Sequence, residues 1–175
     1  METITITAII ALLIPSTAFM FIVVKQIKQQ TNRDKTRNSN ELKKDRQSYF
    51  LPHRVEAHQR IVLFLERISP NSLIMRKFNA THSAKSLQSE LLETIREEFE
   101  HNIAQQLFIS ADSWVKVKNS KEEIIKLINL AASQMKENST AIDLSAKIFE
   151  ISAQINPLPT EITNKILINE LQSLF

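Results

Sequence analysis

The sequence predicts an all-α protein, in which an N-terminal transmembrane helix is followed by a soluble bundle of about five helices. Three observations lead to this prediction: residues 4–24 contain no ionisable side chain, the chain of 175 residues contains no glycine, and apolar residues recur at helical spacing from residue 51 onward. Glycine supplies the positive φ angles of tight hairpin turns and of phosphate-binding loops. Its absence therefore argues against β-hairpins and glycine-rich nucleotide sites, and favours helices.

The first predicted element is a membrane anchor from Ile4 to Val24 (residues 1–24 as a domain). As a helix this stretch would cross a hydrocarbon core of about 30 Å, so membrane lipid is its expected partner. Cations follow the stretch and none precedes it, which predicts a single-pass protein of the bacterial inner membrane with its N-terminus outside and its domain in the cytoplasm. A cleaved signal peptide is the alternative, because Ser16-Thr17-Ala18 resembles a cleavage site. The apolar residues that continue to Val24 favour a retained anchor.

Residues 25–48 are predicted to form a basic polar tether, either mobile or a helical extension of the anchor, because they contain too few apolar residues to fold alone. The basic charge of the chain is concentrated here. The membrane-proximal cations would either set the topology and keep the tether soluble, which is the favoured interpretation, or contact lipid headgroups; they are Lys25, Lys28, Arg33, Lys35 and Arg37. The tether has no aromatic side chain that could stack on bases, so nucleic acid is not an expected partner.

Residues 49–175 are predicted to form the helical domain. Its first helix begins near Leu51-Pro52 and ends before Ser69-Pro70, because proline suits a first turn and disfavours helix in the residue before it. A short apolar turn is expected over residues 73–78. The second helix is expected over residues 84–107, with Ser83 or Thr81 as its N-cap. Its buried row would repeat every four residues: Leu87, Leu91, Ile95, Phe99, Ile103 and Leu107.

Three further helices are expected after residue 110. N-cap candidates at residues 110–113 open the third helix, and Asn138 would end it in the left-handed conformation. The fourth helix is expected from Thr140 to Ile155. The last helix, capped by Thr160, carries apolar residues on more than one face, so it should either pack centrally or meet a partner.

The densest polar cluster lies in residues 93–106. Glu98 and His101 form an E-x-x-H step, which is one quarter of a carboxylate-bridged di-iron site. The chain has no second E-x-x-H and no cysteine, so no metal site, cofactor or catalytic residue is predicted. These polar side chains border the apolar row of their helix, where they would either fix helix register or bind a partner segment.

The candidate interaction residues combine this cluster with the C-terminal helix: Glu98, His101, Asn102, Gln105, Gln106, Leu171, Leu174 and Phe175.

Three segments carry a resemblance to a known family: residues 55–76, 91–110 and 113–129, with the strings LFLERI-x-P and EFEHN-x-x-QQ. They resemble a family of uncharacterised bacterial proteins that have one N-terminal membrane span and a helical domain of unknown function. The resemblance implies an anchored all-α architecture and supplies no activity, substrate or catalytic residue.

We therefore expect a membrane-anchored, non-enzymatic adaptor or accessory subunit, which binds another protein or a second copy of itself through its cytoplasmic helical domain. Two alternatives are kept. One is a metal-dependent enzyme that uses Glu98 and His101, and the other is a membrane-tethered nucleic-acid binder that uses the basic tether.

Overall fold

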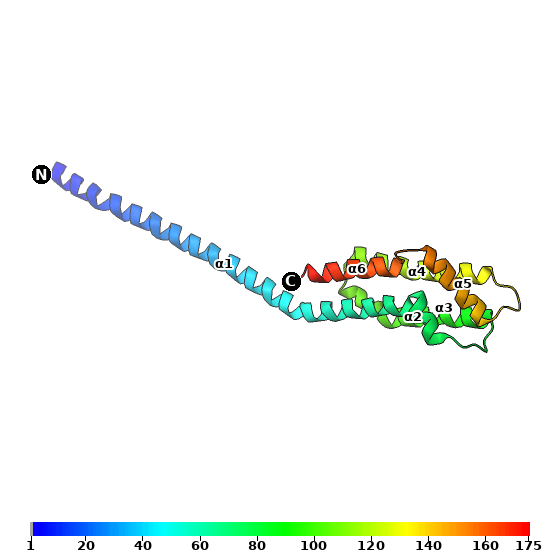
Figure 1. Cartoon of the computed structure of the whole chain (residues 1–175). Helices are drawn as coiled ribbons and strands as arrows, with labels where there is room; N and C mark the ends of the chain where they lie inside the picture. The colour runs from blue at the N-terminus through cyan, green and yellow to red at the C-terminus, as the bar shows by residue number, and fades with distance from the viewer. Residues whose placement is uncertain (1) are drawn as a thin grey trace. The chain divides into compact units, whose positions relative to one another are not determined.

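The structure is a computed structural model of the chain. It describes the backbone of residues 2–175 and the side chains of residues 25–175, apart from positions 32, 34–36, 38–40, 43 and 46. Every regular element of the described backbone is helical (Figure 1). The predicted all-α fold is confirmed.

The elements follow one another in a simple order: α1 (Glu2–Ile68), α2 (Pro70–Lys77), α3 (Ala84–Asn102), the 3-10 helix η1 (Ile103–Leu107), α4 (Ala111–Ser133), α5 (Ala141–Gln154) and α6 (Pro159–Gln172). The chain divides into two compact units, Met1–Phe50 and Leu51–Phe175, and α1 belongs to both. The backbone of residues 25–48 is helical throughout.

The predicted membrane span, Ile4–Val24, lies outside the side chains that the structure describes. Among the described side chains, no helix carries a stretch both long enough and apolar enough to cross a bilayer.

The bundle of the second unit is built around α4, which packs against α3, α5 and α6. The part of α1 from Leu51 onward contributes buried residues at helical spacing, including Ile61, Phe64, Leu65 and Ile68. Three aromatic rings link α1, α3 and α4 inside this core. The ring centroids of Phe64 and Phe99 lie 5.9 Å apart, and Phe99 stacks on Trp114 at 5.7 Å with an interplanar angle of 22°.

Hydroxyl side chains begin three of the helices. Ser83 accepts a hydrogen bond from the N–H of Ser86, and Ser110 accepts one from the N–H of Ser113. Thr140 forms a reciprocal capping box, in which the Asp143 carboxylate accepts the N–H of Thr140 at 2.8 Å. The predicted caps at Ser83 and Ser110 are confirmed.

The starts of α3 and α5 lie side by side. Two backbone hydrogen bonds join them, from Ala84 N to Ser139 O at 3.0 Å and from Ala141 N to His82 O at 2.9 Å. They form the isolated antiparallel bridge between Ser83 and Thr140.

The predicted second helix was wrong at its C-terminal end. It ends at Asn102 rather than at residue 107, and the last turn tightens into η1. Ile103 and Leu107 are 45% and 78% exposed instead of buried. A row at every fourth residue drifts by about 40° per step around a helix, so Ile103 would face away from Leu87 even in a regular helix.

Three smaller predictions were also wrong. The apolar residues expected in a turn over 73–78 lie in α2, whose Leu73 and Ile74 are buried, and Phe78 is its C-cap. Asn138 does not adopt the left-handed conformation, since no described residue has a positive φ. Thr160 does not cap the last helix: Leu158 is the N-cap residue, its N–H donates to the Glu161 carboxylate, and Thr160 is buried in the first turn.

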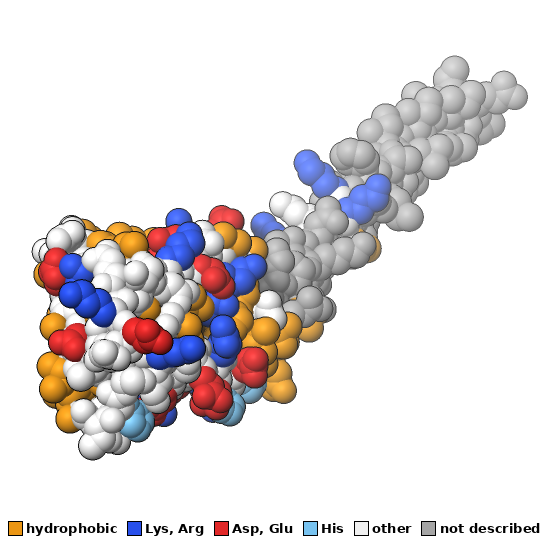
Figure 2. All heavy atoms as spheres, turned by 90° about the vertical axis from the view of Figure 1, so that its right-hand side faces the viewer, with side chains coloured by type: hydrophobic (Ala, Val, Ile, Leu, Met, Phe, Trp, Pro, Cys, Tyr) orange, Lys and Arg blue, Asp and Glu red, His pale blue; other side chains and the backbone are white. Residues whose placement is uncertain are grey.

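Charged side chains of both signs are mixed on the bundle surface. Figure 2 shows Lys and Arg interspersed with Asp and Glu over one face, without a large area of a single sign on that face.

Candidate functional site

Glu98, in α3, is held between two arginines from other helices. Its Oε1 lies 2.6 Å from Nη2 of Arg67 in α1 and 3.4 Å from Nη1 of Arg76 in α2. Arg76 also donates to the carbonyl oxygen of Arg67 at 2.7 Å. The Glu98 side chain is only 16% exposed, so this ion pair joins three helices at a mostly covered position.

His101, the other half of the E-x-x-H step, is exposed on α3. The neighbouring Asn102 amide donates to the carbonyl oxygen of Glu98 at 2.8 Å, which gives a partner to a backbone carbonyl at the end of the helix. Among the described side chains, no group of three or more His, Cys, Asp or Glu residues could hold a metal ion.

A second carboxylate, Glu170 in α6, ties the last helix to the start of α4. It accepts hydrogen bonds from the N–H of Ser110 at 3.0 Å and from the Ser110 hydroxyl at 2.8 Å. Arg54 and His58, both in α1, approach the same carboxylate at 3.8 Å and 3.5 Å. Glu170 therefore joins α1, α4 and α6.

These contacts lower the pKa of Glu170. Burial alone would raise the pKa of this carboxyl group, but the hydrogen bonds from Ser113 and Ser110 and the charge of His58 outweigh burial. The carboxylate is thus the favoured form in the folded protein.

His58 is almost fully buried, with 1% of its surface exposed. Its Nδ1 lies 2.7 Å from the carbonyl oxygen of Arg54, so Nδ1 carries a proton. Its Nε2 faces Glu170 without a hydrogen bond. Sequence reasoning missed both His58 and Glu170, because 112 residues separate them and no local spacing pairs them.

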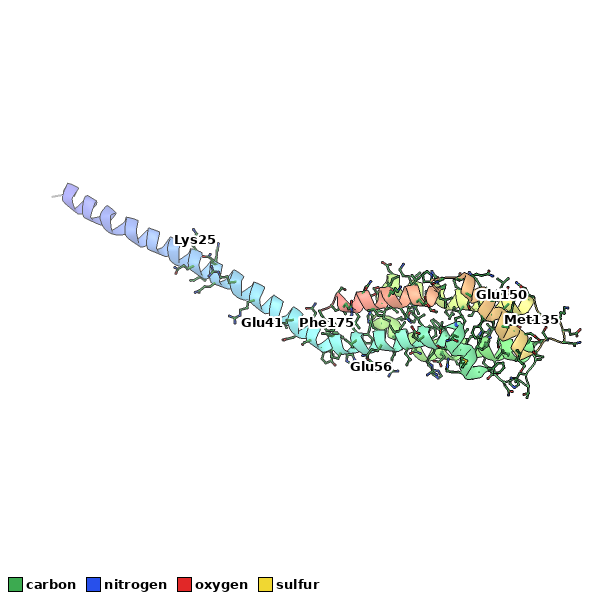
Figure 3. All side chains as sticks on the ribbon, in the orientation of Figure 1. Lys25, Glu41, Glu56, Met135, Glu150 and Phe175 are labelled. Atoms are coloured by element: carbon green, nitrogen blue, oxygen red, sulfur yellow. The ribbon has the colours of Figure 1, made fainter. Side chains whose placement is uncertain are left out.

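The Ser110–Glu170 contact joins the segment that follows η1 to α6, close in sequence to both predicted interaction segments. We name this place the η1–α6 surface; it consists of Ile103, Gln105, Gln106, Leu107, Leu171, Leu174 and Phe175. Leu107 and Phe175 are its most exposed apolar side chains, at 78% and 84%. Figure 3 shows Phe175 at the free end of α6. Gln105, Leu171 and Leu174 are half-buried, and Gln106 is exposed.

An aromatic pair lies at the C-terminal end of η1. The imidazole of His53, near the start of the bundle part of α1, stacks on Phe108 with ring centroids 5.7 Å apart. This stack follows η1 directly, so it fixes the chain at the point where Leu107 is presented to solvent.

The basic side chains of the tether that the structure describes are spread along α1. Lys25, Lys28, Arg33 and Arg37 are exposed along α1, and Arg37 pairs with Glu41 at 3.1 Å. The side chain of Lys35 lies outside the described residues.

Comparisons with curated proteins and with solved structures found no match. A family model covers nearly the whole chain, from residue 4 to residue 174. The protein therefore belongs to the family of unknown function DUF7935.

Proposed function

We propose that this protein is a membrane-anchored, non-enzymatic accessory subunit, which binds another protein through the η1–α6 surface of its cytoplasmic helical domain. The observation that carries the proposal is the joint exposure of Leu107 and Phe175 on elements that Glu170 holds together. Burying a large apolar side chain contributes about 1.5–3 kcal/mol, so two such side chains on a fixed support suit a protein contact.

The proposed cellular location and orientation rest on the sequence of the predicted anchor. Ile4–Val24 has the length and composition of a membrane span, and the cations of the tether follow it directly. The inner membrane with the domain in the cytoplasm agrees best with this charge distribution.

The contacts of the carboxylates support a non-enzymatic role. Glu98 is engaged by Arg67 and Arg76, and Glu170 by Ser110. Both side chains join helices, which is a structural use of an acidic residue rather than a poised acid or base.

Affinity purification of the full-length protein in mild detergent tests the contact. We expect one protein to co-purify in fixed ratio with the unaltered chain, and to be lost with the double variant Leu107→Glu, Phe175→Glu. Met75→Glu is the matched control, because Met75 is 76% exposed on α2, outside the η1–α6 surface. Equal recovery with all three chains, or recovery of the chain alone, would contradict the proposal.

The anchor needs a separate test. We expect the chain to stay in the membrane fraction after a carbonate wash, and a reporter fused after Phe175 to be active in the cytoplasm. A reporter active only in the periplasm would overturn the proposed orientation.

A further inference from the structure

Helix α6 contributes little apolar surface to the core. In the part of the chain that the structure describes, Leu167 is the one residue of α6 that belongs to the buried apolar core. The other buried side chains of this helix are polar: Thr160, Thr163 and Asn164. Helix α5 is equally long, yet it buries four apolar residues in the core: Ala141, Leu144, Ile148 and Ile151. Since apolar burial is the main term that holds a helix on its neighbours, α6 is held more weakly than α5.

Three buried polar atoms on α6, or facing it, have no hydrogen-bond partner among the described residues. Thr160 Oγ1 and Asn164 Oδ1 belong to α6. The third is His58 Nε2 on α1, which faces Glu170 of α6. An unpaired polar atom costs free energy while it is buried and is hydrated once the helix leaves. These atoms therefore favour release of α6.

The contacts that do hold α6 are mostly hydrogen bonds. Glu170 accepts from Ser110, and the hydroxyl oxygens of Ser120 and Thr163 lie 2.8 Å apart. The Asn164 amide donates to the Glu66 carboxylate at 2.6 Å. Water replaces such bonds when a helix leaves, so each contributes only a small net free energy. They define where α6 docks more than how firmly it docks.

The topology lets α6 leave without breaking the rest of the bundle. Helices α3, α4 and α5 pack against one another, whereas α6 packs mainly on α4. It is the last element of the chain, and residues 155–157 before it are exposed (Figure 1). A helix that ends the chain and follows an exposed connection can move away while its neighbours keep their contacts.

We propose that α6 is a releasable helix, which leaves and rejoins the bundle while α3, α4 and α5 stay packed together. Leu171, Leu174 and Phe175 belong to the η1–α6 surface and move with α6. One motion therefore takes this surface apart and restores it. The motion itself does not depend on the proposed function, but its use as regulation of partner binding rests on that function.

Hydrogen exchange of the full-length chain in mild detergent measures the motion without any partner. A released helix of 14 residues is marginal in water, so its amides exchange each time it leaves. Where rejoining is faster than exchange, we expect α6 amides to exchange at least about 10-fold faster than the slowest amides of α4, and more slowly than an unfolded peptide. Equal rates in the two helices, or exchange of α6 at the unfolded rate, would overturn the inference. A failed co-purification would count against the proposed function and not against the motion.

Two matched variants, each of which removes one carbon, separate release of α6 from unfolding of the whole bundle. Ile148→Val should speed exchange in α4 about 2- to 10-fold and leave α6 unchanged, because Ile148 stays buried when α6 alone leaves. Leu167→Val should speed exchange in both helices, because Leu167 leaves the core in both events. Faster exchange of α6 in Ile148→Val would contradict separate release.

The absence of cysteine allows α6 to be locked in place. Because the hydroxyl oxygens of Ser120 and Thr163 are close, Ser120→Cys with Thr163→Cys brings two sulfurs within reach of a disulfide between α4 and α6. In the oxidised form, the α6 amides next to position 163 should exchange as slowly as those of α4. Reduction of the same preparation should restore their fast exchange. Fast exchange at these amides in the oxidised form would contradict movement of α6 as a whole.

Discussion

Glu98 and Glu170 each accept contacts from two other parts of the bundle, and each does so from a mostly covered position. A carboxylate of this kind contributes through ion pairs and hydrogen bonds that water cannot fully replace. Removing the carboxylate leaves its donors without a partner, so the loss should be larger than for an ordinary surface charge.

The contrast between Glu98 and His101 gives a direct test of their roles. Glu98→Ala should lower the free energy of unfolding by about 1–2 kcal/mol, because Arg67 and Arg76 lose their common partner. His101→Ala should change it by less than about 0.5 kcal/mol, because His101 is exposed. Urea denaturation followed by the fluorescence of Trp114, the single tryptophan, measures both. Equal losses, or metal bound by the unaltered chain but not by His101→Ala, would favour the metal-dependent alternative.

Glu170 makes stability depend on acidic pH. Its pKa is lowered in the folded state, so the unfolded chain takes up this proton first as the pH falls. The stabilisation is complete above the ordinary glutamate pKa of about 4.3 and is lost as the pH falls through the folded value. Glu170→Gln should therefore unfold more easily at pH 7, by about 1–2 kcal/mol, and the difference should shrink below about pH 4. A difference that is constant from pH 7 to pH 3 would rule out this linkage.

Sequence patterns could not predict the Glu170 site. His53 and His58 suggest only surface or core-edge positions when read locally, yet His58 is buried against α6. The pairing depends on how α1 and α6 pack, and tertiary packing leaves no spacing signal in either helix.

At the scale of elements, α6 docks through hydroxyl groups as much as through apolar contacts. The Ser120 hydroxyl donates to the carbonyl oxygen of Pro159 at 3.0 Å and lies 2.8 Å from the Thr163 hydroxyl. Ser120 has one proton, so Thr163 must donate to Ser120 when Ser120 donates to Pro159. Leu167 is the fully buried apolar residue of this helix.

This chain of hydrogen bonds predicts an asymmetry between its members. Ser120→Ala should cost about 1–3 kcal/mol, because the buried Thr163 hydroxyl and the carbonyl oxygen of Pro159 both lose their partner. Thr163→Val should cost less than about 1 kcal/mol, because the bond from Ser120 to Pro159 remains. Denaturation curves of the two variants and of the double variant give the coupling. A larger loss for Thr163→Val than for Ser120→Ala would contradict the assigned direction of the bond between Thr163 and Ser120.

Local chemistry predicted where helices begin better than where they end. Ser83 and Ser110 act through bonds to residues three positions ahead, which the sequence displays directly. The end of α3 at Asn102 and the burial of polar residues on α6 depend instead on distant segments.

At the scale of the whole molecule, the composition decided the fold class. A chain without glycine avoids positive φ, and the described backbone has none. Helices joined by short polar turns meet this condition, which is why the all-α prediction did not need the details of any one element. The arrangement of the helices was not predictable, because several packings satisfy the same apolar periodicity.

The division at Phe50/Leu51 predicts how the chain can be shortened. A fragment of residues 51–175 keeps every residue of the described core, which begins at Ala57, so it should fold with the helix content and Trp114 emission of the bundle in the full chain. A fragment of residues 69–175 lacks Ile61, Phe64 and Leu65, which are buried at the centre of the core. Losing several such side chains removes more than the 5–15 kcal/mol that stabilises a typical domain, so this fragment should not fold. Circular dichroism and urea titration of both fragments separate the outcomes. A bundle that folds without residues 51–68 would show that α1 only covers it, and a fragment 51–175 that stays unfolded would make the first unit part of the same cooperative structure.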